Sequence, residues 1–180
     1  YALLYDLMMS DLVLSGDIEH WAEKTQLVWR TIPDFVGAFE NGRAILVIRD
    51  PRSVLASFKN FTYEPEPAYL GAIFNMLDVL QKANQYKKRL NANQFHIIRY
   101  EDVVKDTQAT ITDAFKFLGL SSDHNLLSTE GWTDTSGDPW EINSSFEDDE
   151  FDEEAAVYRW KNNLEPWELS LCEMVVGDVM

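Results

Sequence analysis

Apolar residues recur along this chain in two patterns, one helical and one strand-like. Spacings of three or four residues predict helices over residues 1–14, 26–42, 68–90 and 107–120, from Pro51 onwards, and from about Pro166 to the end. Continuous apolar runs bounded by turn residues predict strands, buried on both faces, at 44–48 and 95–100. Residues 20–25 fit neither pattern.

Breaker residues refine these elements. Pro33 either kinks or restarts the helix over 26–42, Asn41-Gly42 ends it, and Gly119 ends the helix over 107–120. The order strand, helix, helix, strand, helix predicts an α/β fold with a parallel sheet covered on both faces. Residues 121–154 have no periodicity and form a long loop, which is typical of functional or disordered segments.

The length suits one domain, so residues 1–180 are interpreted as a single unit without repeats. The chain starts at Tyr1 and stops at Met180 inside an expected helix, so we expect a fragment that is incomplete at both ends. No apolar run approaches the roughly 20 residues that span a bilayer. A single cysteine, Cys172, excludes an internal disulfide and favours the cytoplasm.

A formal net charge of −16 argues against binding to nucleic acid or to an anionic membrane, because both need a basic surface. Seven of the carboxylates lie in the stretch FEDDEFDEE, residues 146–154, which is typical of a solvated loop. The field at any anion site therefore depends on the residues nearby.

The stretch AILVIRDPRSVLASF, residues 44–58, carries the first candidate site. Asp50 is a good N-cap, and Pro51 suits the first position of a helix. Ser53 and Ser57 are four residues apart and share a helix face. An arginine at the strand end, Arg49, with helix amides and a hydroxyl, suits a phosphate. The alternative is an ordinary turn in which Arg49 pairs with a nearby carboxylate.

The second strand ends in the same way, in IIRYEDVVKD. Tyr100 is expected at the carboxyl edge, where its ring can stack on or hydrogen-bond a nucleobase, or belong to the core. Glu101 and Asp102 suit the first turn of a helix.

Residues 20–25, HWAEKT, place a carboxylate beside an ammonium. Glu23 and Lys24 suit a base and an electrophile, although such pairs are usually surface ion pairs; His20 is a rival base. Metal-ligand spacing is absent from the sequence, because the histidines and Cys172 are scattered.

Together, EKT, ILVIRDPRSVLASF, IIRYEDVVKDTQATITDAFKFLGL, NSSF and YRWKNNL resemble the sulfotransferase family in order and approximate spacing. That family has a P-loop-like α/β fold and takes its sulfuryl group from 3′-phosphoadenosine 5′-phosphosulfate (PAPS), without a metal. The resemblance implies that Arg49 and Ser57 hold the 3′-phosphate, that Tyr100 contacts the adenine, and that Lys24 assists at the transferring group.

Three departures qualify this resemblance. The family's glycine-containing loop for the 5′-phosphosulfate is absent, which fits a chain that starts downstream of it. Gln26 stands where cytosolic members carry a histidine base, whereas Glu23 matches the glutamate of glycan-modifying members. DEEAAVYRWK is acidic where a basic clamp is expected, leaving Arg159 and Lys161 as substitutes.

The sequence therefore predicts a PAPS-dependent sulfotransferase that acts on a carbohydrate or another small hydroxyl acceptor. Two alternatives stay open. One is another P-loop-type enzyme such as a small-molecule kinase, and the other is a non-catalytic nucleotide-binding or interaction remnant. The acceptor and the oligomeric state are not encoded in any recognisable pattern.

Overall fold

The computed structural model describes residues 20–25, 28–61, 68–121 and 153–180. The helix expected at 1–14 and nearly all of the loop expected at 121–154 lie outside these residues. The elements before the second strand are η2 (Trp29–Thr31), α2 (Ile32–Ala38), β1 (Ala44–Ile48), α3 (Pro51–Phe61), η3 (Ala68–Leu70) and α4 (Gly71–Arg89). They are followed by β2 (Phe95–Arg99), α5 (Tyr100–Lys105), α6 (Thr107–Leu118), α7 (Glu153–Tyr158), α8 (Trp160–Asn163), α9 (Pro166–Val176) and η5 (Gly177–Val179).

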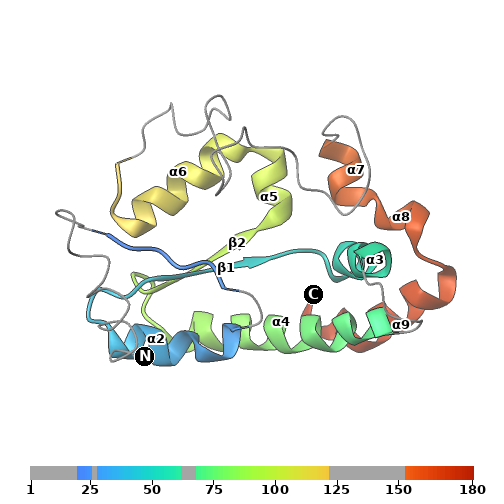
Figure 1. Cartoon of the computed structure of the whole chain (residues 1–180), viewed down its shortest axis with the longest axis horizontal. Coiled ribbons are helices and arrows are strands. Elements are labelled where there is room, and N and C mark those ends of the chain that lie inside the picture. Colours follow the sequence, from blue (N-terminus) through green and yellow to red (C-terminus); the bar gives the residue numbers. More distant parts are fainter. Residues whose placement is uncertain (1–19, 26–27, 62–67, 122–152) are drawn as a thin grey trace.

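The two strands pair in parallel, with Ala44 opposite Phe95 and Ile48 opposite Arg99. Helices α3 and α4 form the crossover between them, as parallel pairing requires. Helices α2 and α4 lie on one side of the sheet, while α5 and α6 lie on the other (Figure 1). This confirms the α/β class, the parallel sheet and its helical covering.

The prediction that the first strand is buried on both faces is wrong for β1. The side chain of Val47 is 59% exposed, and no residue of β1 is fully buried. Among the described residues, β1 has a hydrogen-bonded neighbour along one edge only. The apolar run therefore overstated the burial of β1.

Helix boundaries follow local signals, with two corrections. The helix expected over 26–42 is the shorter α2, which restarts after η2 with Pro33 in its first turn. Gly119 caps α6 in the left-handed region at φ 74°, as predicted. Helix α7 begins at Glu153, inside the stretch expected to be loop, and the helical form of α7 and α8 was not predicted.

The buried core lies where α3, η3, α4, α8 and α9 meet. It contains Leu55, Ala56, Tyr69, Ala72, Ile73, Leu164, Cys172 and Val176. No helix among the described residues is long and apolar enough to cross a membrane.

One carboxylate, that of Glu168 on α9, belongs to this core and is fully buried. Its Oε2 accepts from Lys59 Nζ at 2.8 Å and from the Glu165 backbone N–H at 2.6 Å, and its Oε1 accepts from the Tyr69 hydroxyl. Burial alone would raise the pKa of Glu168, but these hydrogen bonds outweigh it and hold the pKa below its ordinary value. The network ties α9 to α3 and η3.

Cys172 should resist alkylation in the folded chain. Its side chain is fully buried, and burial raises the pKa of the thiol to about 11, so the reactive thiolate is scarce at neutral pH. We expect iodoacetamide to label Cys172 only after denaturant is added, as followed by mass spectrometry. Rapid labelling in native buffer would contradict this burial.

Candidate functional site

The candidate site is the corner where β1 ends and α3 begins. Asp50 Oδ1 accepts the backbone N–H of Arg52 at 2.9 Å, which satisfies one free amide of the first helical turn. Pro51, the first residue of α3, has no N–H to satisfy. The turn therefore forms as its sequence predicts.

Arg52, the second arginine of the Arg-Asp-Pro-Arg stretch, is held by carboxylates. Its Nη2 lies 2.7 Å from Asp50 Oδ2, and its Nη1 lies 3.4 Å from Glu173 Oε1 on α9. The guanidinium carbon is also 4.1 Å from the centroid of the Trp160 ring. The hydrogen bonds that Arg52 donates to Asp50 raise the pKa of Arg52. Arg52 thus links α3 to α8 and α9.

Arg49 has different surroundings. Its guanidinium carbon lies 4.3 Å from the centroid of the Tyr100 ring, and its Nη2 donates to the Ala156 carbonyl at 2.5 Å. It forms no ion pair with any residue that the structure describes, and its Nε is buried without an acceptor there. Tyr100 and Ala156 belong to α5 and α7, which lie on the side of the sheet opposite α4 (Figure 1).

Burial lowers the pKa of Arg49, and the positive charge of Arg159 acts in the same direction. Because an arginine stays protonated at neutral pH even so, the corner holds a half-buried positive charge that forms no ion pair with any described residue, although Glu101 and Asp50 lie near enough to stabilise it. The structure thereby brings Arg49, Tyr100 and Arg159 together, three of the residues predicted to bind the donor.

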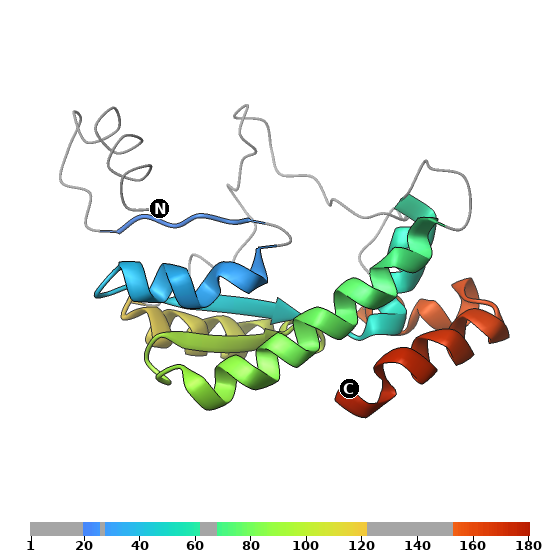
Figure 2. The ribbon, with the colours of Figure 1, turned by 90° about the horizontal axis from the view of Figure 1, so that it is seen from below.

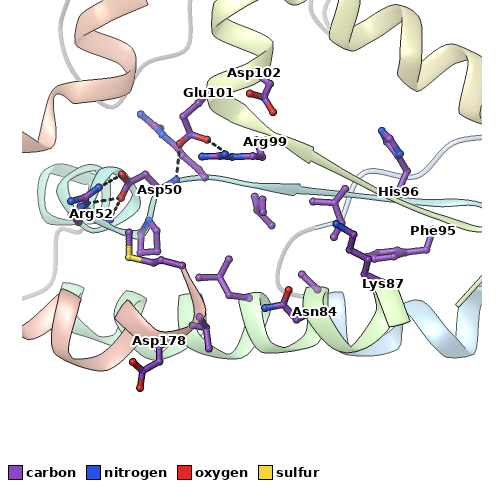
Figure 3. A pocket seen from close by; sticks show the side chains of 18 of the residues that line it. Asp50, Arg52, Asn84, Lys87, Phe95, His96, Arg99, Glu101, Asp102 and Asp178 are labelled. Atoms are coloured by element: carbon purple, nitrogen blue, oxygen red, sulfur yellow. Dashed lines mark hydrogen bonds and ion pairs between the residues drawn. The ribbon is translucent and has the colours of Figure 1, made fainter. Parts of the chain in front are cut away.

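Glu101 joins the ends of the two strands. Its Oε1 accepts the backbone N–H of Asp50 at 2.7 Å, and its Oε2 lies 3.9 Å from Arg99 Nε (Figure 3). The sequence had placed Glu101 only at a helix start. Since the carboxyl ends of neighbouring parallel strands share one edge, the acidic residue after Tyr100 was the available signal.

A hollow of about 960 Å³ adjoins this corner on the α4 side of the sheet. Asn84 and Lys87 of α4 form its floor, while Arg99, Glu101 and Asp50 lie at the strand ends (Figure 3). The residues that the structure describes include no group of three His, Cys, Asp or Glu side chains placed to hold a metal ion.

A family model for the sulfotransferase family matches residues 4–124, more than half of the chain. The chain belongs to the sulfotransferase family. No curated protein matches the sequence significantly.

Two solved sulfotransferase domains share the fold. The domain from the curacin biosynthetic pathway superposes with a TM-score of 0.68 at 21% identity, over 98% of this chain and 66% of that one. The domain from the Synechococcus PCC 7002 olefin synthase gives a TM-score of 0.53 at 22% identity, over 73% of this chain and 48% of that one. The chain thus spans two thirds or less of these domains, and the likeness confirms the sulfotransferase-type α/β fold.

Two further residues predicted to bind the donor, Ser57 and Lys161, lie on α3 and α8. Ser57 is partly buried on α3, eight residues after Arg49 in the sequence. Ser53 is buried, and its hydroxyl donates to the Val157 carbonyl at 2.8 Å. Lys161 is exposed, with Nζ 4.3 Å from the centroid of the Tyr158 ring. The donor roles of Ser57 and Lys161 stay predictions.

The predicted catalytic pair lies on the extended segment 20–25, which runs beside α2 (Figure 2). Trp21 anchors this segment edge-on against Phe35 and Phe39, with ring centroids 5.9 Å away from each. Glu23 and Lys24 are exposed, as is His20, and neither member of the pair bonds to another described residue. The choice of Glu23 or His20 as base stays open.

Proposed function

We propose that this chain carries the 3′-phosphate half of a sulfotransferase site, which moves a sulfuryl group from PAPS to a hydroxyl of a small acceptor. The surroundings of Arg49 support this proposal. Its side chain is half-buried, lies beside Tyr100 and Arg159, and forms no ion pair with any described residue. Family membership supplies the reaction class.

The residues at this corner fit a bound phosphate. The buried Nε–H of Arg49 has no acceptor among the residues that the structure describes, and a phosphate oxygen would satisfy both the hydrogen bond and the charge. Arg159 would add a second positive charge, and Tyr100 an aromatic surface for the adenine. Ser57 would donate its hydroxyl to the same phosphate, and Lys161 would approach from α8.

When bound, PAPS supplies an activated sulfuryl group whose transfer resembles phosphoryl transfer, in which charge spreads over the equatorial oxygens. Glu23 would accept the proton of the acceptor hydroxyl, and Lys24 would stabilise the charge that develops on the leaving 5′-phosphate. Arg49 would hold the far end of the donor in place.

The acceptor class is part of the proposal. Glu23 favours a carbohydrate hydroxyl, as in glycan-modifying members of the family. The two structural neighbours are domains of a biosynthetic pathway and of an olefin synthase, which favours non-carbohydrate hydroxyls as well. An acceptor panel for this protein should therefore contain both kinds.

A donor panel tests the function. We expect the full-length protein to transfer the sulfuryl group from PAPS equally well with and without a chelator. It should also bind adenosine 3′,5′-bisphosphate and transfer no phosphoryl group from ATP. Chelator-sensitive phosphoryl transfer from ATP would instead indicate a small-molecule kinase. Failure to bind any adenine nucleotide would indicate an interaction module.

A further inference from the structure

We infer that Glu101 is a positioning residue for the donor site: its carboxylate fixes the turn between β1 and α3 and thereby sets the place of Arg49. This inference rests on the proposed function, because it concerns the arginine assigned to the 3′-phosphate. Glu101 itself would not touch the donor.

The hydrogen bond between the Asp50 N–H and Glu101 satisfies a donor for which the local backbone offers no acceptor. Paired residues of the parallel ladder end at Ile48 and Arg99, so the Asp50 N–H lies just beyond it. In a capping box, a Glu or Gln at the third helical position would reach back to this N–H. That position is Ser53, whose hydroxyl is engaged by the Val157 carbonyl. Glu101 supplies the missing acceptor from the neighbouring strand end, at 2.7 Å.

The position of this bond matters because Asp50 directly follows Arg49. The Glu101 side chain is only 17% exposed, so its carboxylate has little freedom to move away from the Asp50 N–H. A phosphate-binding arginine must be held to within about 0.5 Å of its productive place. We call this hydrogen bond the brace. Its loss would let the Arg49–Asp50 peptide shift and would misplace the Arg49 guanidinium.

The two possible roles of Glu101, fixing the turn by a hydrogen bond or acting by its negative charge alone, predict opposite effects of its removal on the affinity for an anionic ligand. Glu101 is close enough to Arg49 to stabilise its charged form, and a carboxylate there also repels an incoming phosphate. If Glu101 acted by charge alone, its removal would strengthen phosphate binding. If it acts as a brace, loss of the acceptor must weaken binding, while loss of the charge alone must not.

The experiment measures the dissociation constants of two ligands for the full-length protein, adenosine 3′,5′-bisphosphate and adenosine 5′-monophosphate, which lacks the 3′-phosphate. We expect Glu101→Ala to weaken the bisphosphate about tenfold, as one charged hydrogen bond allows, and to leave the monophosphate unchanged. Glu101→Gln keeps an oxygen acceptor and should bind the bisphosphate at least as tightly as the wild type. With PAPS, Glu101→Ala should raise KM and leave kcat unchanged.

Asp102→Ala is the matched control, because it removes an exposed carboxylate from the next position of α5 without touching Asp50. It should leave both constants unchanged. If Glu101→Ala does not fold, Glu101→Met keeps the side-chain volume, removes the acceptor and serves in its place.

Three outcomes overturn the inference. In the first, Glu101→Ala loses the same affinity for both ligands. In the second, Glu101→Gln binds the bisphosphate as weakly as Glu101→Ala does, and in the third, Glu101→Ala binds it as tightly as the wild type. Arg49→Ala separates this inference from the proposed function. Weak bisphosphate binding by Arg49→Ala together with normal binding by Glu101→Ala refutes the brace alone. Unchanged binding by Arg49→Ala refutes the donor assignment and the brace with it.

Discussion

Replacing Arg49 with alanine should weaken binding of adenosine 3′,5′-bisphosphate roughly 30- to 100-fold, which corresponds to about 2–3 kcal/mol for a charge-assisted hydrogen bond. The reason is that Arg49 is a half-buried cation with an unsatisfied Nε–H and no ion pair among the described residues. A phosphate would be its counter-charge, so truncation removes the charge-assisted hydrogen bond that Arg49 would make to it.

Arg52→Ala is the matched control for Arg49→Ala. It removes the same charge from the same turn, but Arg52 is already paired with Asp50 and Glu173 and stacked on Trp160. We expect Arg52→Ala to lower the free energy of unfolding by about 1–2 kcal/mol and to change the bisphosphate affinity little. Isothermal titration and urea denaturation of both variants provide these measurements.

Equal losses of affinity in the two variants would mean that the general positive charge of this turn attracts the ligand. Wild-type affinity in Arg49→Ala would place the 3′-phosphate elsewhere. Arg49→Lys adds a further check: it keeps the charge but loses the planar fork, so its affinity should lie between those of the wild type and Arg49→Ala.

The corner itself could be predicted because its causes are local. An apolar run followed by a capping aspartate and a proline at the first helical position specifies strand, turn and helix within a few residues. The approach of Arg49 to Tyr100 follows from one further step. Since Ile48 pairs with Arg99, the residues that follow each strand are neighbours.

The partners of Arg52 could not be predicted from the sequence. Arg52 is neutralised partly by Glu173, which is 121 residues away, and it packs on Trp160 of α8. Such pairings depend on how helices pack, and no local pattern encodes them. The same holds for Glu101, whose partner is the backbone N–H of Asp50, just beyond the end of β1.

Helices α7 and α8 were not predicted because their sequence pattern is weak and because contacts with other elements stabilise them. The stretch is short, and an acidic run precedes it. The Val157 carbonyl accepts from Ser53, and the Asn163 carbonyl accepts from Lys59 at 3.3 Å. Short helices are marginal in isolation, so contacts with α3 hold them in place.

Glu168→Gln should lower the free energy of unfolding by about 3 kcal/mol at neutral pH, the low end for removal of one partner from a buried ion pair. The substitution keeps the side-chain volume but leaves Lys59 without its counter-charge. The low end applies because the Lys59 side chain is 28% exposed and water can partly solvate its ammonium. Urea denaturation of wild type and variant at pH 7 measures the difference.

The effect should depend on pH in a definite direction. The folded-state pKa of Glu168 lies below its ordinary value, so its charged form stabilises the fold above about pH 4.3, the pKa of an unperturbed glutamate. That stabilisation is lost as the pH falls through the folded-state pKa. In acid the protonated carboxyl resembles the amide of glutamine, and the difference between wild type and Glu168→Gln should shrink towards zero.

Glu173→Gln is the control on the same helix, because its carboxylate is 56% exposed and pairs with Arg52 at 3.4 Å. An exposed ion pair of this kind contributes roughly 0.2–1 kcal/mol. Equal losses in the two variants would show that the position on α9, and not burial, decides the cost. A loss in Glu168→Gln that stays constant down to acidic pH would contradict a charged Glu168, and the Lys59–Glu168 ion pair could then not be what joins α9 to α3.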